Sequence, residues 1–302
     1  MAVALLSNLA LDKRFKQNLQ DNIEENVLPA FESLLNDENS QLDVVPSCIS
    51  AVFNLAANEV IRSKLANRKQ LWETCLAVLS RHSDKLDQPV HTDIVGSILG
   101  LVMNMSLNVS NNLRAFGVSM CRHCLDLCRG DRRHALLVSR GLGVLGHVLP
   151  HSIPGVDWVC DNQGTATFLH FIKENESEEN RKTALKSLVA CTQINEIARK
   201  YIVDNKGLGA LMRLLKNTDD AVVGNAALCL SHCAQVNKVC AALAKTEIIQ
   251  DLLALARETE RHKIQQNCAI LIAKLAQGDT RHLDRLRELH GIEILHSCMK
   301  YL

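Results

Sequence analysis

The feature that most constrains this chain of 302 residues is an internal repeat. Seven nine-residue segments align without gaps, and their starts are separated by 46, 50, 43, 43, 42 and 42 residues. A period of this length is typical of proteins that stack one small structural unit many times, so each unit adds its own slice of core. The segments are Ala2–Ala10, Cys48–Ala56, Ile98–Ser106, Gly141–Leu149, Ala184–Thr192, Ala226–Ala234 and Cys268–Ala276.

Apolar residues recur at fixed positions of these aligned segments. The first position is small except at Ile98, and the fifth and eighth are apolar throughout. Positions one, five and eight fall on one stripe of an α-helix, so each segment predicts a helix buried along that side. The fifth position is Leu6, Val52, Val102, Leu145, Leu188, Leu230 and Ile272, and the eighth is Leu9, Leu55, Met105, Val148, Cys191, Cys233 and Leu275.

The last three periods predict what surrounds this helix. A short helix over 195–203 is followed by a glycine-marked break at 206–209, a helix over 210–216, and turn residues at 217–220 that cap a long helix ending near Gln235. Such a triplet cannot bury its apolar face alone, so neighbouring triplets must stack. The same order recurs with helices over 239–244, 248–257 and 264–277, and again over 283–289 and 292–299 around Gly291.

The three-helix unit, whose third helix ends in Asn-Leu-Ala at residues 8–10 and 54–56, resembles the armadillo repeat. The resemblance covers the whole chain and implies an all-α, armadillo-type α-solenoid, a right-handed superhelix of three-helix repeats. The pattern is degenerate from Pro89 to Asn180, and an insertion is expected to lengthen the loop around 81–92. HEAT repeats are the close alternative, but they lack the short first helix and the glycine break.

We expect residues 1–302 to form a single solenoid of about seven repeats, with the first and last incomplete. The chain opens on the third helix of a repeat, and it finishes at Met299–Leu302 on a second helix. Solenoids need terminal repeats that cover the apolar faces of the stack. The parent protein is therefore expected to extend N-terminally.

Charge and composition argue against several classes of partner. The chain has 34 Lys and Arg against 33 Asp and Glu, whereas nucleic-acid binding usually needs a basic surplus. The uncharged stretch from Ile94 to Leu113 contains four Asn, which lipid would leave unpaired, so we predict a buried helix and no membrane span. No secretory signal is visible, and the twelve cysteines suit a reducing compartment, so we predict a cytoplasmic protein.

Two segments could suggest chemistry. Cys121, Cys124 and Cys128 share one helical face, but a closed zinc site needs a fourth ligand and favours turns, so we interpret the thiols as packing residues. The glycines of Gly141–Gly146 match neither a phosphate-binding loop nor a dinucleotide fingerprint, and they indicate close helix contact or a local kink. No histidine has a recognisable nucleophilic partner. We predict no catalytic residue, metal or cofactor, and no enzymatic activity.

The seventh position of the aligned segments carries the candidate binding residues. In armadillo proteins that bind extended peptides, third helices line a concave groove and an Asn at this position hydrogen-bonds the peptide backbone. An amide near a helix end can equally cap the helix or face water. Importin-type repeats place Trp one turn earlier, where this chain has Ala4, Ser50 and Gly100, so nuclear-signal binding is doubtful. By the resemblance, the candidates are Asn8, Asn54, Asn104, His147, His232 and Lys274, with Ala190 interrupting the series.

Residues 227–234 and 285–292 resemble the armadillo half of co-chaperones that couple tetratricopeptide repeats to an armadillo domain. That resemblance implies a role in the cytoplasmic preassembly of axonemal dynein arms, with dynein subunits and chaperones as partners. We therefore predict a scaffold that holds other proteins as extended segments or assembly clients. The alternative is an importin- or catenin-like adaptor that binds extended peptides in nuclear transport or at cell junctions.

Overall fold

The computed structural model describes residues 7–37, 42, 44–130, 134–173, 177–258 and 261–299. Throughout these ranges the regular structure is helical and no strand occurs, as the sequence predicts. The chain divides into two compact units, Met1–Val159 and Cys160–Leu302, called unit 1 and unit 2 below. Each unit is described by itself.

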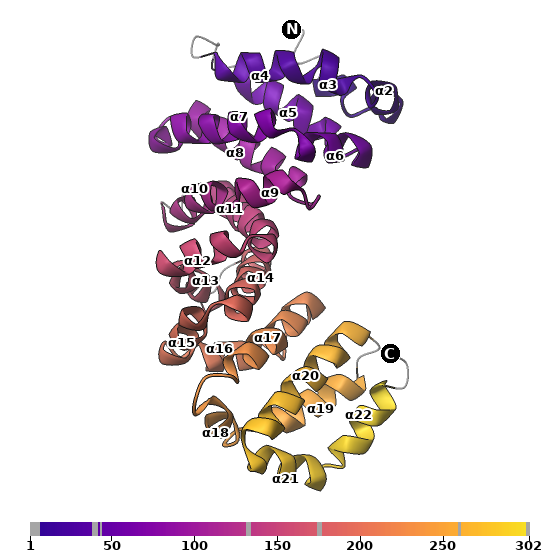
Figure 1. Cartoon of the computed structure of the whole chain (residues 1–302), viewed down its shortest axis with the longest axis vertical. Coiled ribbons are helices and arrows are strands. Elements are labelled where there is room, and N and C mark those ends of the chain that lie inside the picture. Colours follow the sequence, from indigo (N-terminus) through magenta and orange to yellow (C-terminus); the bar gives the residue numbers. More distant parts are fainter. Residues whose placement is uncertain are drawn as a thin grey trace. The chain divides into compact units, whose positions relative to one another are not determined.

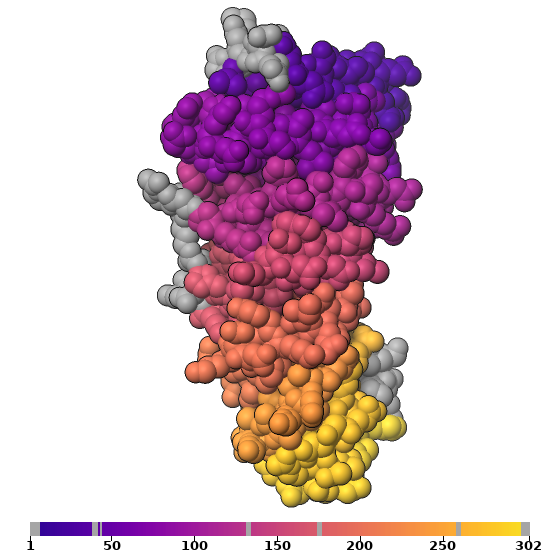
Figure 2. Space-filling model, turned by 60° about the vertical axis from the view of Figure 1, so that its left-hand side comes forward, coloured from indigo at the N-terminus to yellow at the C-terminus, as the bar shows by residue number. Residues whose placement is uncertain are grey.

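Unit 1 is organised around three third helices that follow one another in Figure 1, namely α5 (Val45–Leu55), α8 (Pro89–Met105) and α11 (Ala135–Val148). Helix α8 packs directly against both α5 and α11. Figure 2 shows side chains filling the space between neighbouring repeats in the indigo and purple part of the surface. The remaining helices are α2 (Lys13–Leu19), α3 (Ile23–Asn26), α4 (Leu28–Asn36), α6 (Glu59–Asn67), α7 (Lys69–His82), α9 (Asn111–Ala115), α10 (Gly117–Arg129) and α12 (Ile153–Asp161), with short 3₁₀ helices η1 (Ser83–Lys85) and η3 (Leu149–His151).

Unit 2 repeats the same plan with more regular helices. Its third helices are α14 (Glu178–Ile194), α17 (Asp220–Cys233) and α20 (His262–Gly278), and α17 packs between the other two. Helices α19, α20 and α22 lie side by side at the C-terminal end of Figure 1. The other helices of this unit are α13 (Gly164–Lys173), α15 (Glu196–Asp204), α16 (Gly207–Leu214), α18 (Val239–Leu243), α19 (Ile248–Glu258), α21 (Thr280–Glu288) and α22 (Gly291–Met299).

The predicted buried stripe is confirmed in the repeats from Cys48 onward. From that repeat on, every side chain at the fifth position is at most 1 % exposed, and every side chain at the eighth position is 0 % exposed. Leu9 is an exception, because it is 41 % exposed in a repeat that has a described neighbour on one side only. Leu6 and Ala2 lie outside the described residues.

Polar caps explain where the first helix of each repeat begins. Asn58 accepts a hydrogen bond from the backbone N–H of Ile61 at 3.1 Å, and Asn195 accepts one from Ala198 at 3.2 Å. Each cap lies within a few residues of the end of the preceding third helix. Such side chains satisfy backbone donors that the first turn leaves unpaired, so they start a new helix right after a break. Asp12, Ser110 and Asp279 cap α2, α9 and α21 in the same way.

The glycine-marked breaks occur where the sequence predicts them, but glycine is not the residue that bends the chain. Lys206 and His290 adopt left-handed backbone angles, with φ of 59° and 50°, and the following glycines begin α16 and α22. A Cβ atom on Gly207 would lie 2.6 Å from Cγ2 of Ile202 and 2.8 Å from its carbonyl oxygen. Glycine is therefore required at residue 207 because α16 begins close to α15, and not because the backbone has a positive φ there.

The degenerate central region is more regular than expected. The predicted loop insertion around 81–92 is largely helical, because η1 follows α7 and α8 already begins at Pro89. The glycine run lies within an unbroken α11, and a Cβ atom on Gly143 would lie 2.7 Å from the Met103 sulfur. Gly143 therefore permits close packing of α11 on α8, and Gly141 lies against α10, where an added Cβ atom would be 3.3 Å from the carbonyl oxygen of Cys124.

A buried histidine pair joins the end of α7 to the start of α8. The Nδ1 atoms of His82 and His91 are 2.6 Å apart, and the two side chains are 4 % and 5 % exposed. One ring must donate and the other accept, so the hydrogen bond cannot form when both rings are protonated. Burial, followed by repulsion from His91, Arg81 and Lys85, lowers the pKa of His82 to about 4.

This pair predicts acid sensitivity of unit 1. In the unfolded chain His82 takes up a proton near pH 6.5, but in the folded chain it does so near pH 4. The unfolded state binds more protons between these values, so stability is lost as pH falls through this window. We expect urea denaturation to show a loss of about 1–2 kcal/mol from this group between pH 7.5 and 5. The variant His82→Gln should show a shallower pH dependence, and an unchanged slope would contradict the assignment.

Candidate partner-binding surface of the third helices

The structure places the predicted seventh-position residues at equivalent sites on successive third helices. In unit 1, Asn8 is exposed, whereas Asn54, Asn104 and His147 are half-buried on α5, α8 and α11. In unit 2, Ala190 is buried on α14, and His232 and Lys274 are half-buried on α17 and α20. From Asn54 onward the residue two positions earlier is buried, so the polar side chains at the seventh position mark the edge between core and solvent. In each unit taken by itself, we call the surface that carries these residues the third-helix surface of that unit.

One of the predicted amides also links two repeats. The Nδ2 atom of Asn54 donates a hydrogen bond to the backbone carbonyl of Ser7 at 3.3 Å. An Asn side chain has a second N–H and a carbonyl oxygen, so this contact leaves hydrogen-bonding capacity for a ligand. Asn54 therefore combines a structural contact with availability at the surface.

In unit 2 the equivalent position is occupied by a histidine held in place by its neighbour. The Nδ1 atom of His232 lies 3.0 Å from the hydroxyl oxygen of Thr192, which also bonds the carbonyl of Leu188 on its own helix. Burial, then repulsion from Lys274 and Arg199, lowers the pKa of His232 to about 4. The imidazole is therefore neutral at pH 7 and offers hydrogen bonds rather than charge.

A hollow of about 310 Å³ opens beside Asn54, and its other lining residues are Ser50, Phe53, Ser97 and Arg140. These residues come from all three third helices of unit 1, α5, α8 and α11. The hollow combines one aromatic face, two hydroxyls, an amide and a guanidinium, a mixture suited to binding a polar polypeptide segment.

Sequence reasoning missed Arg140 because it stands one residue before an aligned segment. Its Nη1 atom donates to the carbonyl oxygen of Gly96 on α8. The same contact recurs in unit 2, where Nδ2 of Asn267 donates to the carbonyl oxygen of Gly224 at 3.1 Å. In both units a glycine at the equivalent position exposes the accepting carbonyl. The recurrence of Gly96 and Gly224 is the sequence signal that could have found these contacts.

The three-helix repeat of this chain resembles that of known proteins. The model of the armadillo/beta-catenin-like repeat matches residues 195–235, the segment that contains α15, α16 and α17. The chain is 32 % identical over 305 residues to human tetratricopeptide repeat protein 12, and equally to the mouse protein. Among solved structures it is similar to a designed armadillo repeat protein at 13 % identity, with a TM-score of 0.65, covering 82 % of this chain and 99 % of that one.

The chain has the fold of an armadillo-repeat solenoid. A second designed armadillo repeat protein, in complex with the peptide (KR)4, has a TM-score of 0.63 at 12 % identity and covers 83 % of this chain and 100 % of that one. The match to the human and mouse proteins includes 100 % of this armadillo chain, which spans 42 % of the length of either relative.

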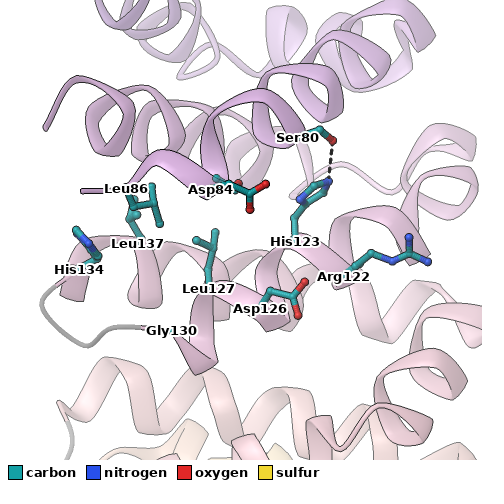
Figure 3. Close-up of a pocket in the computed structure, with 11 residues that line it drawn as sticks. Ser80, Asp84, Leu86, Arg122, His123, Asp126, Leu127, Gly130, His134 and Leu137 are labelled. Atoms are coloured by element: carbon teal, nitrogen blue, oxygen red, sulfur yellow. Dashed lines mark hydrogen bonds between the residues drawn. The ribbon is translucent and has the colours of Figure 1, made fainter. Parts of the chain in front are cut away.

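A second cavity in the armadillo chain, of about 350 Å³, lies between α7, η1, α10 and α11 (Figure 3). The hydroxyl oxygen of Ser80 is 3.2 Å from Nε2 of His123, and Asp84 and Asp126 also line the cavity. Ser80 lies within α7, where the backbone N–H groups are hydrogen-bonded along the helix. They are therefore not free to form an oxyanion hole. The cavity therefore gives no support for serine-hydrolase chemistry.

The cysteines of the armadillo core behave as the packing interpretation predicts. Cys121, Cys124 and Cys128 are all buried on α10, and burial raises the pKa of Cys121 and of Cys128 to about 12. A thiol with such a pKa stays protonated at neutral pH and is a poor nucleophile. In the ranges that the structure covers, no group of three or more His, Cys, Asp or Glu side chains is arranged to hold a metal ion. Likewise, no helix within those ranges is long and apolar enough to cross a membrane.

Proposed function

We propose that this armadillo-repeat chain is a non-enzymatic scaffold that binds extended segments of other proteins along its third-helix surface. The observation that supports this most strongly is the row of half-buried polar side chains on consecutive third helices, bordered by the hollow beside Asn54. An extended segment leaves its backbone amides and carbonyls unpaired, and a row of amide side chains can pair with them.

More specifically, we propose that the bound proteins are assembly clients of a cytoplasmic co-chaperone for axonemal dynein arms, with dynein subunits and chaperones among them. The support is the resemblance of residues 227–234 and 285–292 to such co-chaperones. The 32 % sequence identity to tetratricopeptide repeat protein 12, which extends over the whole chain, also supports this proposal. The chain spans 42 % of the length of that relative, and we propose that it contributes the binding surface to this role.

The alternative is an importin- or catenin-like adaptor for nuclear transport or cell junctions. Importin-type binding needs a Trp at the third position of the repeat, and Ser50 and Gly100 occupy that position on α5 and α8. In the structure this lack of a large side chain is what leaves the hollow open beside Arg140. The hollow therefore favours a different kind of ligand from a nuclear signal.

The amide row can be tested by replacing Asn8, Asn54 and Asn104 together with Ala. The loss of stability should stay near 1 kcal/mol, since one amide is exposed and one makes a single inter-repeat hydrogen bond. Partner binding should weaken at least about tenfold, because each lost hydrogen bond to a peptide backbone removes roughly 0.5–1.5 kcal/mol. Proximity labelling in ciliated cells, with the labelling enzyme fused to this chain, would measure capture of dynein subunits.

A matched control replaces three exposed amides away from the third-helix surface, Asn67, Gln70 and Gln88, which lie on α6, on α7 and just before α8. This control should label the same proteins as the unmodified chain. Equal labelling by both triple variants would show that the third-helix surface is not the binding surface. Absence of dynein subunits from every sample would remove the dynein role while leaving the scaffold role to be judged on the other labelled proteins.

A further inference from the structure

The third-helix surface of unit 1 contains a cation that the fold itself does not neutralise. Arg140 is half-buried, and its guanidinium lies along α8 over Gly96 and Gly100. A Cβ atom on Gly100 would lie 3.4 Å from Cζ of Arg140 and 3.4 Å from Cε2 of Phe53. The missing side chain therefore makes room for the guanidinium on one side and the aromatic ring on the other.

The hydrogen-bonding capacity of Arg140 is mostly unused. One N–H group bonds the carbonyl of Gly96, whereas a guanidinium carries five donors in a planar fork. In the part of the chain that the structure describes, no Asp or Glu forms an ion pair with Arg140. Burial lowers the pKa of Arg140, but an arginine stays charged at neutral pH. A half-buried cation without a counter-charge is stabilised by any anion that reaches it.

The residues that line the hollow beside Asn54 include no Asp or Glu. None of the seven aligned segments contains Asp or Glu, and their charged residues are Lys186 and Lys274. Both lysines belong to unit 2, where burial lowers the pKa of Lys186. In unit 1 the hollow itself offers hydroxyls from Ser50 and Ser97 and the amide of Asn54 beside the guanidinium. Hydroxyl and amide N–H groups can donate to the second oxygen of a carboxylate held by an arginine.

We propose that unit 1 binds an acidic polypeptide segment, with one Asp or Glu side chain of that segment paired with Arg140 in the hollow beside Asn54. The volume of about 310 Å³ accommodates a carboxylate side chain with some of its water. This inference rests on the proposed function, because it assumes that an extended chain lies along the third-helix surface. It adds that the bound chain is acidic and that Arg140 is the residue that selects it.

The test uses the purified 302-residue chain and four pools of octapeptides, in which every second residue is fixed as Glu, Gln, Lys or phosphoserine and the others are randomised. The immobilised chain should retain the Glu pool at least about tenfold more than the Gln pool, and the Lys pool least. Arg140→Gln should reduce retention of the Glu pool about tenfold. Arg114→Gln, which removes the same charge from an exposed site on α9, should change it less than about twofold.

A second variant keeps the test decisive if Arg140→Gln folds poorly. Ser50→Glu introduces a carboxylate into the hollow, where it should pair with Arg140. Retention of the Glu pool should therefore be lost, while the thermal midpoint stays near that of the unmodified chain. Equal retention of the Glu pool by Ser50→Glu, Arg140→Gln and Arg114→Gln would overturn the proposal. So would preferential retention of the Lys pool or of the phosphoserine pool.

The two proposals fail in different ways. If the triple amide variant loses retention of all pools while Arg140→Gln loses none, the third-helix surface binds polypeptides but does not select acidic ones. If Arg140→Gln loses the Glu pool while the triple amide variant retains it, the acid site exists without the predicted amide row. Retention of no pool by the unmodified chain would overturn the acidic-segment inference itself.

Discussion

Replacing Val102 with Asp should unfold unit 1. The side chain is 0 % exposed on α8, the helix that packs against α5, α7 and α11. A carboxylate at this site would be removed from water without a partner, which costs several kcal/mol even after local relaxation. That cost is comparable with the 5–15 kcal/mol by which typical domains are stable. Circular dichroism should therefore show loss of roughly the helical signal of this unit and of its cooperative thermal transition.

Leu107→Asp is the matched control, because Leu107 lies just after α8 and is 53 % exposed. It introduces the same charge near the same helix and should shift stability by less than about 0.5 kcal/mol. Equal thermal midpoints for the Val102→Asp and Leu107→Asp proteins would show that the fifth position of the repeat is not a core position.

Replacing Trp72 with Ala should cost about 3–5 kcal/mol of unfolding free energy. The indole is 0 % exposed on α7, its Nε1 atom donates to the carbonyl of Ala66 at 2.9 Å, and its ring stacks on Phe116 with centroids 6.3 Å apart. Truncation leaves a large void between two repeats and removes both contacts. Urea denaturation followed by the fluorescence of Trp158, the other tryptophan, measures the loss.

Trp72→Phe separates the packing of the ring from its hydrogen bond. The phenyl ring preserves most of the buried area and the contact with Phe116, and Asn112 still donates to the carbonyl of Ala66 at 3.2 Å. We expect this variant to lose about 1–2 kcal/mol. A loss below about 1 kcal/mol for Trp72→Ala would mean that the repeats around α7 and α10 adjust to fill the void, contrary to close packing.

The two proposed binding features differ in how far the sequence could predict them. The amide row follows from the repeat alignment, because Asn54, Asn104 and their equivalents stand at one position of a helix whose buried side is obvious. Arg140 stands outside the aligned segment and is unremarkable in sequence. Its importance depends on Gly96 and Gly100 of another helix, which leave room for its side chain. For this contact across 44 residues, the sequence signal is the glycine that recurs at the equivalent position in Gly96 and Gly224, far from Arg140 itself.

The sequence alone determined the parts of this protein that depend on short-range pattern. Apolar residues at helical spacing identified the buried stripe of each third helix, since i, i+4 and i+7 share a face whatever the helix packs against. Asn195 and Asp219 indicated helix starts, because a capping side chain accepts a hydrogen bond from a backbone N–H group within three residues of itself. The armadillo architecture follows from these patterns and their period of 42–50 residues.

The tertiary structure decided what depends on how the repeats meet. In the structure Lys206, and not Gly207, has left-handed backbone angles. Residue 207 must be glycine because Ile202 lies too close to leave room for a Cβ atom. Packing also buried His82 against His91 and placed Arg140 across α8. Each of these outcomes depends on the distance between helices, which arises from the fit of many side chains at once and cannot be read from any single segment.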